Sequence, residues 1–169
     1  MYNIPFDPDD EGPLPMIGPD RLIYLRALEQ KILWLSTWII HHANHIREND
    51  GQLKVGGHQA SCASMVTLMT ALYFSVLRPN DRVAVKPHGS PVFHAIQYVL
   101  GQQTQSHLER FRALGGAQSY PSRTKDVDDV DFSTGSVGLG VAMTSFASLI
   151  QKFIETHGWK VDKGRMVAV

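Results

Sequence analysis

Apolar and polar positions along the chain form patterns that predict helices separated by short strands. From Asp20 to about Asn49, leucine and isoleucine recur every three or four residues, which is typical of an amphipathic helix. Further helices are predicted over residues 59–77, 91–100, 105–114 and 138–157. Residues 82–85 and 165–169 are short apolar runs, which are typical of buried strands. Strands that alternate with helices predict an α/β fold, with a parallel sheet flanked by helices.

The first nineteen residues differ in composition from the rest of the chain. They contain five of the nine prolines and four acidic residues, and they lack lysine and arginine. Because proline fixes φ and donates no backbone hydrogen bond, residues 1–19 are predicted to form an extended arm. This arm is either a disordered leader or a segment that lies along a partner subunit. Residues 20–169 are predicted to form the domain, with a polar, Asp-rich loop over 119–131.

Charge and cysteine content exclude several classes of protein. Sixteen basic and sixteen acidic residues give a formal net charge of zero, which offers no electrostatic footprint for nucleic acid or for an acidic membrane surface. The apolar runs are shorter than the ~20 residues that a membrane-spanning helix needs. Cys62 is the one cysteine, so it cannot form an internal disulfide, and a reducing compartment such as the cytoplasm is expected.

Three histidine positions are candidate sites within the first half of the chain. His41 and His45 lie one helical turn apart, a spacing that can hold a metal, but the sequence places no third ligand beside them. The alternative is a pair of histidines favoured by the helix dipole near a C-terminus. His58 follows two glycines and precedes a helix, where exposed backbone donors suit an anionic ligand. The alternative there is a turn histidine satisfied by the backbone.

Two further segments follow along the chain. His88 comes directly after the strand predicted over 82–85, so we expect it at the carboxyl edge of the sheet, where ligands bind in open α/β folds. A glycine-rich loop over 133–140 opens the last helix. No lysine follows it as in a Walker sequence, and the alternative to a phosphate loop is that its glycines let the backbone approach a flat ring closely.

Four segments are more specific together than any one of them alone. They are residues 57–61, 88–91, 119–121 and 135–140. This ordered set resembles the amino-terminal half of thiamin-diphosphate enzymes of the transketolase group, over residues 20–169 of this chain. The spacing and the Tyr-Pro pair at 120–121 look most like the homodimeric pyruvate dehydrogenase, the decarboxylating first component of the oxo-acid complexes. Transketolase proper usually has Gly-His-Pro-Glu in place of residues 119–122, so it is the second choice.

The resemblance implies roles for particular residues. His58 and His88 match the two histidines that line the site around the diphosphate and the reacting carbon, and they are the implied catalytic residues. Tyr120 would border the aminopyrimidine ring, and the backbone carbonyl of Val137 would accept from its amino group. The full set of implied cofactor-binding residues is Ser61, Tyr120, Gly135, Val137, Gly138 and Leu139. In such enzymes the thiamin diphosphate is the electron sink, while the protein positions and tunes it.

The chain also departs from the family pattern. Lys86-Pro87 stands where these enzymes usually have a polar residue and a glycine, which leaves the acceptor substrate open. The Gly-Asp-Gly metal motif expected directly after the 165–169 strand is absent from the sequence, and so is the glutamate of a further domain. We therefore expect the amino-terminal part of a longer, Mg²⁺-dependent enzyme that decarboxylates pyruvate or a related 2-oxo acid. By itself, the chain is expected to be inactive and to bind neither thiamin diphosphate nor a metal.

Two alternatives stay open, namely ketol transfer of the transketolase type and a non-catalytic interaction module that keeps the fold. A homodimer is expected, because the helices predicted over 59–77 and 138–154 are apolar on nearly every side and one small domain covers only part of such helices. The alternative is that further domains of the same chain cover these faces, in which case the isolated chain would aggregate. The other implied partners are the 2-oxo acid substrate and the acyltransferase component of an oxo-acid dehydrogenase complex.

Overall fold

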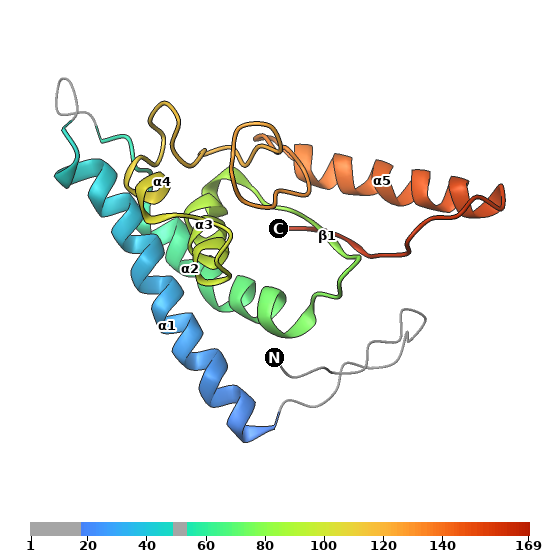
Figure 1. Ribbon diagram of the computed structural model, residues 1–169, viewed down its shortest axis with the longest axis horizontal. Helices are drawn as coiled ribbons and strands as arrows, with labels where there is room; N and C mark the ends of the chain where they lie inside the picture. The colour runs from blue at the N-terminus through green and yellow to red at the C-terminus, as the bar shows by residue number, and fades with distance from the viewer. Residues whose placement is uncertain (1–17, 49–53) are drawn as a thin grey trace.

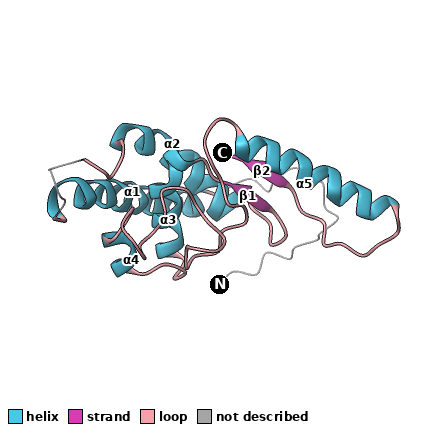
Figure 2. Cartoon of the chain, turned by 90° about the horizontal axis from the view of Figure 1, so that it is seen from above, coloured by secondary structure: helices cyan, strands magenta, loops and turns pink. Residues whose placement is uncertain are grey.

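A layer of helices lies beside a small parallel sheet in this protein (Figures 1 and 2). The structure is a computed structural model, and it describes residues 18–48 and 54–169. The combination of helices with a parallel sheet confirms the predicted α/β fold. Residues 1–17 of the predicted arm lie outside the described residues.

Three helices form the layer that carries most of the core. α1 (Pro19–His41) continues into a π-helical turn, η1 (His42–Ile46), and α2 (Gln59–Ala71) continues into a second one, η3 (Leu72–Val76). α3 (Ser90–Val99) packs against both α1 and α2 (Figure 1). Buried apolar side chains of this layer include Ile32, Leu35, Ile39, Ile40, Val66, Met69, Val92, Phe93 and Ile96. The apolar spacing in the sequence predicts all three of these helices.

The sheet consists of two strands within the described residues. β1 (Arg82–Ala84) and β2 (Met166–Ala168) run parallel, with Val83 opposite Val167. α5 (Leu139–Thr156) packs against both strands, and in Figure 2 the strands lie between α5 and the helical layer. This arrangement places the carboxyl end of β1 next to the helices that follow the predicted histidine turns.

Both edges of β1 have hydrogen-bond partners. Along one edge the partners are backbone groups of β2 and its flanking residues. Along the other edge two side chains take the place of a strand. The Asp131 carboxylate accepts from the Val83 N–H at 2.8 Å, and the Thr134 hydroxyl donates to the Val85 carbonyl at 2.5 Å. The end of the polar loop and the start of the glycine loop are therefore fixed along β1.

One predicted helix is shorter than expected. The prediction of a helix over 105–114 was wrong, because α4 spans only Gln105–Glu109. After α4 the chain turns back on itself, and the Arg112 N–H donates to the Ala117 carbonyl at 2.9 Å. Phe111 lies within this turn and is fully buried. Burial of this ring and the hydrogen bonds of the turn outweigh the helix propensity of the local sequence.

The helical run over residues 59–76, formed by α2 and η3, is long and apolar enough to cross a membrane by length and composition. The sequence pattern predicts this apolar helix, but the expectation that its apolar run is too short for a membrane span was wrong by this measure. A core helix can pass the same test, and this one packs against α1 and α3 with Val66 and Met69 buried. We therefore interpret one face of the run as part of the core.

Asp81 joins the turn before β1 to the segment before β2. Its side chain is almost fully buried, and its carboxylate accepts from the Arg165 N–H at 2.8 Å and from the Arg78 N–H at 2.9 Å. The Arg165 guanidinium donates to both oxygens of the same carboxylate. Burial by itself would raise the pKa of Asp81, but these donors outweigh it and hold the pKa below its usual range.

We predict that Asp81→Asn lowers the free energy of unfolding by about 1.5–3 kcal/mol at neutral pH, because it removes charge-assisted hydrogen bonds from a buried carboxylate. A carboxyl group with a depressed folded pKa stabilises above its unfolded pKa of about 3.9, and this contribution is lost as the pH falls through the folded value. Denaturant unfolding across acidic pH measures both effects. Asp162→Asn is the matched control, since Asp162 is exposed in the segment before β2, and an equal loss in both variants would contradict the prediction.

Candidate functional site

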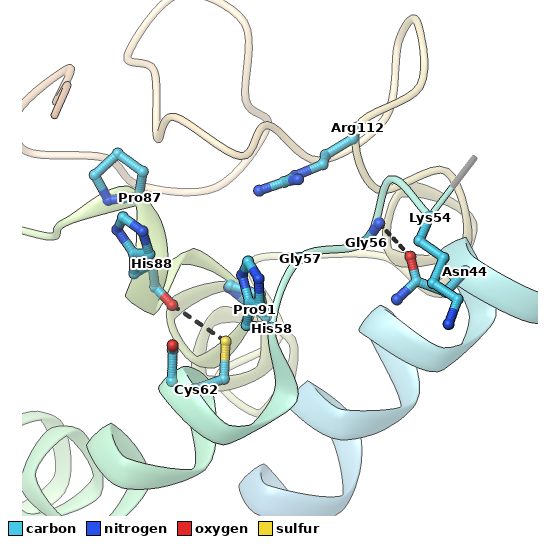
Figure 3. Close-up of a pocket in the computed structure, with 11 residues that line it drawn as sticks. Asn44, Lys54, Gly56, Gly57, His58, Cys62, Pro87, His88, Pro91 and Arg112 are labelled. Atoms are coloured by element: carbon cyan, nitrogen blue, oxygen red, sulfur yellow. Dashed lines mark hydrogen bonds between the residues drawn. The ribbon is translucent and has the colours of Figure 1, made fainter.

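A pocket of about 360 Å³ opens where the N-terminus of α2 meets the carboxyl end of β1 (Figure 3). Its walls come from the end of the first helical run, the glycine turn, the start of α2, the turn after β1, and the turn after α4. The described residues that line it are Asn44, Lys54, Gly56, Gly57, His58, Ser61, Cys62, Pro87, His88, Pro91 and Arg112. This is the edge of the sheet where ligands bind in open α/β folds.

The glycine turn sets the position of His58. The Gly56 N–H donates to the side-chain oxygen of Asn44 at 2.6 Å. A Cβ on Gly56 would lie 2.5 Å from the Ile40 carbonyl oxygen, so only glycine fits there. Gly57 has a φ of +92°, which glycine adopts without a steric penalty. The turn therefore places the exposed His58 at the N-cap position of α2, where its side chain makes no capping hydrogen bond.

His88 enters the pocket from another wall. After β1 the chain forms a 3₁₀ turn, η4 (Pro87–Gly89), which leads directly into α3 and leaves the His88 side chain exposed. The Cys62 thiol of α2 donates to the His88 carbonyl at 3.1 Å and so connects the two walls (Figure 3). Burial raises the pKa of the Cys62 thiol to about 11. The thiol is therefore protonated at neutral pH and is not a nucleophile.

The structure brings three of the predicted site residues together and keeps the others apart. His58, Ser61 and His88 all line the pocket. The predicted residues outside its described lining are Tyr120, Gly135, Val137, Gly138 and Leu139. Tyr120 is 52% exposed and Val137 is fully exposed. Tyr120 lies on the polar loop and Val137 on the glycine loop over 133–140. Their cofactor role stays a prediction.

Lys54 and Arg112 are pocket residues that the sequence analysis missed. Both carry a positive charge, and none of the described lining residues is acidic. Lys54 could have been found from its place just before the glycine pair. Arg112 has no local signal, because it reaches the pocket only through the turn that replaces the predicted end of α4. The positive charge of the described lining therefore suits an anionic ligand.

His41 and His45 lie against each other, with ring centroids 5.0 Å apart. Among the described residues, the one group of three or more side chains that could hold a metal together is His94, Asp126 and Asp128. The described residues thus bring no third ligand to His41 and His45. The metal hypothesis for this pair stays without a complete ligand set.

Comparison with known proteins gives relatives in two groups of enzymes. The chain is 33% identical over 113 residues to the pyruvate dehydrogenase E1 component of Cupriavidus necator, and the match covers 62% of this chain and 13% of the relative. It is 27% identical over 151 residues to the enzyme of the same name from Escherichia coli K12, with 84% of this chain and 16% of the relative covered. It is 28% identical over 116 residues to transketolase-like protein 2 of Mus musculus, with 62% and 18% covered.

The chain is a homologue of the pyruvate dehydrogenase E1 component and of transketolase-like proteins. This confirms the resemblance that the four sequence segments indicate. The chain spans less than a fifth of the length of these relatives. No protein-family model matches it.

A second cluster of polar side chains lies in the core of the protein. His94 of α3 is fully buried, with Nδ1 2.6 Å from the Asp128 carboxylate and Nε2 2.7 Å from the Gln118 carbonyl oxygen. A carbonyl oxygen only accepts, so Nε2 carries a proton, and a further proton lies between Nδ1 and the carboxylate. Because both ring nitrogens are engaged, we interpret the group as a hydrogen-bond network and not as a metal site.

This network extends into the polar loop. The Gln103 side-chain amide donates to Asp128 at 2.9 Å. The Asp126 carboxylate accepts from the N–H groups of Gln118 and Ser122, each at 2.8 Å. The loop that carries Tyr120 is thereby anchored to the helical layer. Sequence reasoning missed the network because a histidine inside a helix has no local feature that reveals its partners.

The His94 network predicts a particular pH dependence of stability. Burial by itself would lower the pKa of His94, but the hydrogen bond and charge of Asp128 outweigh it, and the charge of Asp126 adds to them, so the pKa lies above its usual value. A histidine with a raised folded pKa stabilises fully below its unfolded pKa of about 6.5, and this contribution is lost as the pH rises through the folded value. We predict that Asp128→Asn costs about 3–5 kcal/mol at acidic to neutral pH, and less at alkaline pH.

Unfolding free energies across pH measure this effect, and NMR titration of the His94 ring reports its pKa directly. Asp129→Asn is the control, because Asp129 is exposed in the same loop. In the wild type, His94 should titrate above pH ~6.5, and in Asp128→Asn its pKa should fall. A wild-type pKa at or below the ordinary value would show that the prediction is wrong.

Proposed function

We propose that this chain is the amino-terminal part of a thiamin-diphosphate-dependent enzyme that decarboxylates pyruvate or a related 2-oxo acid. The relatives named pyruvate dehydrogenase E1 component support this reaction class, since one match covers 84% of the chain. The observation that carries the proposal is the pocket, which brings His58 and Ser61 of one segment together with His88 of another at one edge of the sheet.

The chemistry of the pocket suits the diphosphate end of such a cofactor. Lys54 and Arg112 are cationic, and the described lining contributes no carboxylate to oppose them. The left-handed Gly57 turn lets a ligand approach the backbone closely, and the start of α2 supplies unpaired N–H groups. Mg²⁺ prefers oxygen ligands, so its carboxylate ligands would have to come from elsewhere in the protein.

The proposed division of labour follows from these positions. When bound, thiamin diphosphate supplies the electron sink that a 2-oxo acid needs for loss of CO₂. Lys54 and Arg112 attract and orient anions. His58 and His88 are exposed in the pocket and hold or move a proton near the reacting carbon. Cys62 stays a neutral donor to the His88 carbonyl, and this hydrogen bond connects the two walls.

The glycine loop supports the same proposal through its backbone conformation. Val137 has a φ of +55°, in the left-handed region that β-branched residues rarely adopt. Such strained positions cluster at ligand sites, because the surrounding structure must hold them against a steric cost. The Thr134 hydroxyl anchors this loop on the Val85 carbonyl at 2.5 Å. The proposed role of Val137 is to present its backbone carbonyl to the aminopyrimidine.

Ketol transfer of the transketolase type is the second candidate, and the match to transketolase-like protein 2 favours it. For either reaction we propose a homodimer in the cytoplasm. For the pyruvate dehydrogenase type we also propose contact with the acyltransferase component of an oxo-acid dehydrogenase complex.

The test is CO₂ release from pyruvate by the complete protein that the gene encodes, with thiamin diphosphate and Mg²⁺ present. We predict that His58→Ala and His88→Ala each lower the turnover number by ~10²–10⁴, because each removes a positioned acid–base group. Their melting temperatures should stay close to that of the wild type, since both side chains are exposed. The assay is run in parallel with ketol transfer from a sugar phosphate.

His107→Ala is the matched control, because His107 lies on α4 outside the pocket and bonds to Thr104. It should leave turnover unchanged. Ketol transfer without CO₂ release would establish the second candidate. Absence of both reactions would leave the non-catalytic interaction module as the function. Full activity in both pocket variants would instead contradict the catalytic roles of His58 and His88. The coding sequence beyond Val169 gives an independent check, since Gly-Asp followed by acidic residues there supports the enzyme.

The apolar surface of α5 supports the proposed homodimer. Its exposed apolar residues are Leu139, Val141, Phe146, Leu149, Ile150 and Phe153. We predict a discrete dimer in sedimentation velocity, because an exposed apolar strip of this kind is normally covered in the assembled protein. Leu149→Glu should dissociate the dimer, while Lys152→Glu on the exposed part of the same helix should not. A monomeric wild type at all concentrations would contradict the prediction.

A further inference from the structure

Arg112 has an unusual backbone conformation for its residue type. Its φ is +62°, and among the described residues Val137 is the only other non-glycine residue with a positive φ. The strain is held in place locally, because the Arg112 N–H donates to the Ala117 carbonyl at 2.9 Å and the adjacent Phe111 ring is fully buried. Strained positions of this kind point to a function that the strain serves.

The strained backbone directs the Arg112 side chain over the pocket. Figure 3 shows its guanidinium reaching from the turn after α4 into the space between the His58 turn and the His88 turn. Its Nη1 donates to the Val55 carbonyl at 2.7 Å, which fixes one edge of the guanidinium. Because a guanidinium has five N–H donors in a planar fork, the edge around Nη2 is left for a ligand.

Arg112 lies against the glycine turn. A Cβ on Gly57 would lie 3.4 Å from the Arg112 Nη2, which is ordinary van der Waals contact. The guanidinium therefore lies directly beside the turn that carries His58. The sequence separates Arg112 from that turn by the whole of α2, β1 and α3, and only the fold brings them together.

The charge around Arg112 is not neutralised by its described neighbours in the pocket. The other described cation of the lining is Lys54, and the described lining holds no acidic residue. Cys62 does not balance this charge, since burial raises the pKa of its thiol to about 11 even though Arg112 acts to lower it. A forked donor without a carboxylate partner suits an oxyanion, which it can bind through two parallel hydrogen bonds.

We propose that Arg112 is the residue that recognises the anionic group of the pocket's ligand and makes the pocket specific for anions. The proposal rests on the proposed function, because it assumes that the ligand lies between His58 and His88. Two sources offer the required oxyanion, namely the diphosphate of the cofactor and the carboxylate of the 2-oxo acid. Arg112 binds the oxyanion with its free edge, while Val55 holds the other edge in place.

The experiment titrates the complete protein that the gene encodes with inorganic pyrophosphate and, separately, with pyruvate, at constant ionic strength. NMR signals of the His58 and His88 rings report occupancy of the pocket. In the wild type we expect saturable shifts with the anion that Arg112 recognises. Arg112→Gln should weaken that binding roughly 10- to 100-fold, because it removes a charge-assisted hydrogen bond. Arg112→Lys should be weakened less, since it keeps the charge and loses the fork.

Two further variants separate recognition from folding. Arg110→Gln is the matched control, since Arg110 is equally exposed but donates to the Leu114 carbonyl and lies outside the described lining. It should bind the anion as the wild type does. Arg112→Gly adopts the left-handed backbone freely, so we expect it to fold and still to lose anion binding. In Arg112→Gln the dependence of affinity on salt should also become weaker, which a purely structural role would not produce.

Wild-type affinity for both anions in Arg112→Gln and Arg112→Gly would overturn the proposal, as would an equal loss in the Arg110 control. Absence of saturable binding of either anion to the wild type would overturn it as well. The outcome for the proposed function is separate. Anion binding that depends on Arg112, without CO₂ release or ketol transfer, would uphold this inference and reject the proposed enzyme. CO₂ release or ketol transfer that is unchanged in Arg112→Gln would uphold the enzyme and reject this inference.

Discussion

The backbone of β1 is the element on which the rest of the structure depends. Val83 and Ala84 are buried, so the N–H and C=O groups of the strand must find partners inside the protein. β2 satisfies one edge, while Asp131 and Thr134 satisfy the other. Because Asp131 ends the polar loop and Thr134 belongs to the glycine loop, the same hydrogen bonds that complete the strand also fix these two loops. The carboxyl end of β1 thus becomes the point where the glycine loop and the His88 turn meet.

Two polar clusters among the described residues handle charge in opposite ways. In the core, His94 and Asp128 are paired at 2.6 Å and their neighbours complete the network, as burial of charged groups requires. In the pocket, Lys54 and Arg112 have no acidic partner among the described lining residues. At an open surface, water solvates such charges at little cost, and they stay available to a ligand. The paired cluster therefore holds the loop, and the unpaired one is the proposed anion site.

Backbone strain is concentrated near the same edge of the sheet. Arg112 and Val137 both have positive φ, although neither is a glycine. The Ala117 carbonyl holds the turn of Arg112, and Thr134 anchors the loop of Val137. Hydrogen bonds to other parts of the fold thus hold backbone conformations that the local sequence does not favour. This is the expected arrangement where a side chain or a carbonyl has to be presented in a fixed direction.

The sequence by itself determined the helices, the two strands, their parallel arrangement and the glycine turn of His58, because these features depend on local periodicity and on glycine chemistry. It also indicated the family, since the motif segments keep their order along the chain. Only the tertiary structure decided the end of α4, the partners of His94 and the presence of Arg112 in the pocket. Each of these depends on contacts between residues that are far apart in the chain, such as Arg112 with Val55 or His94 with Asp128. Periodicity and propensity describe a residue's neighbours along the chain, whereas burial and hydrogen bonding across the fold select which side chains meet.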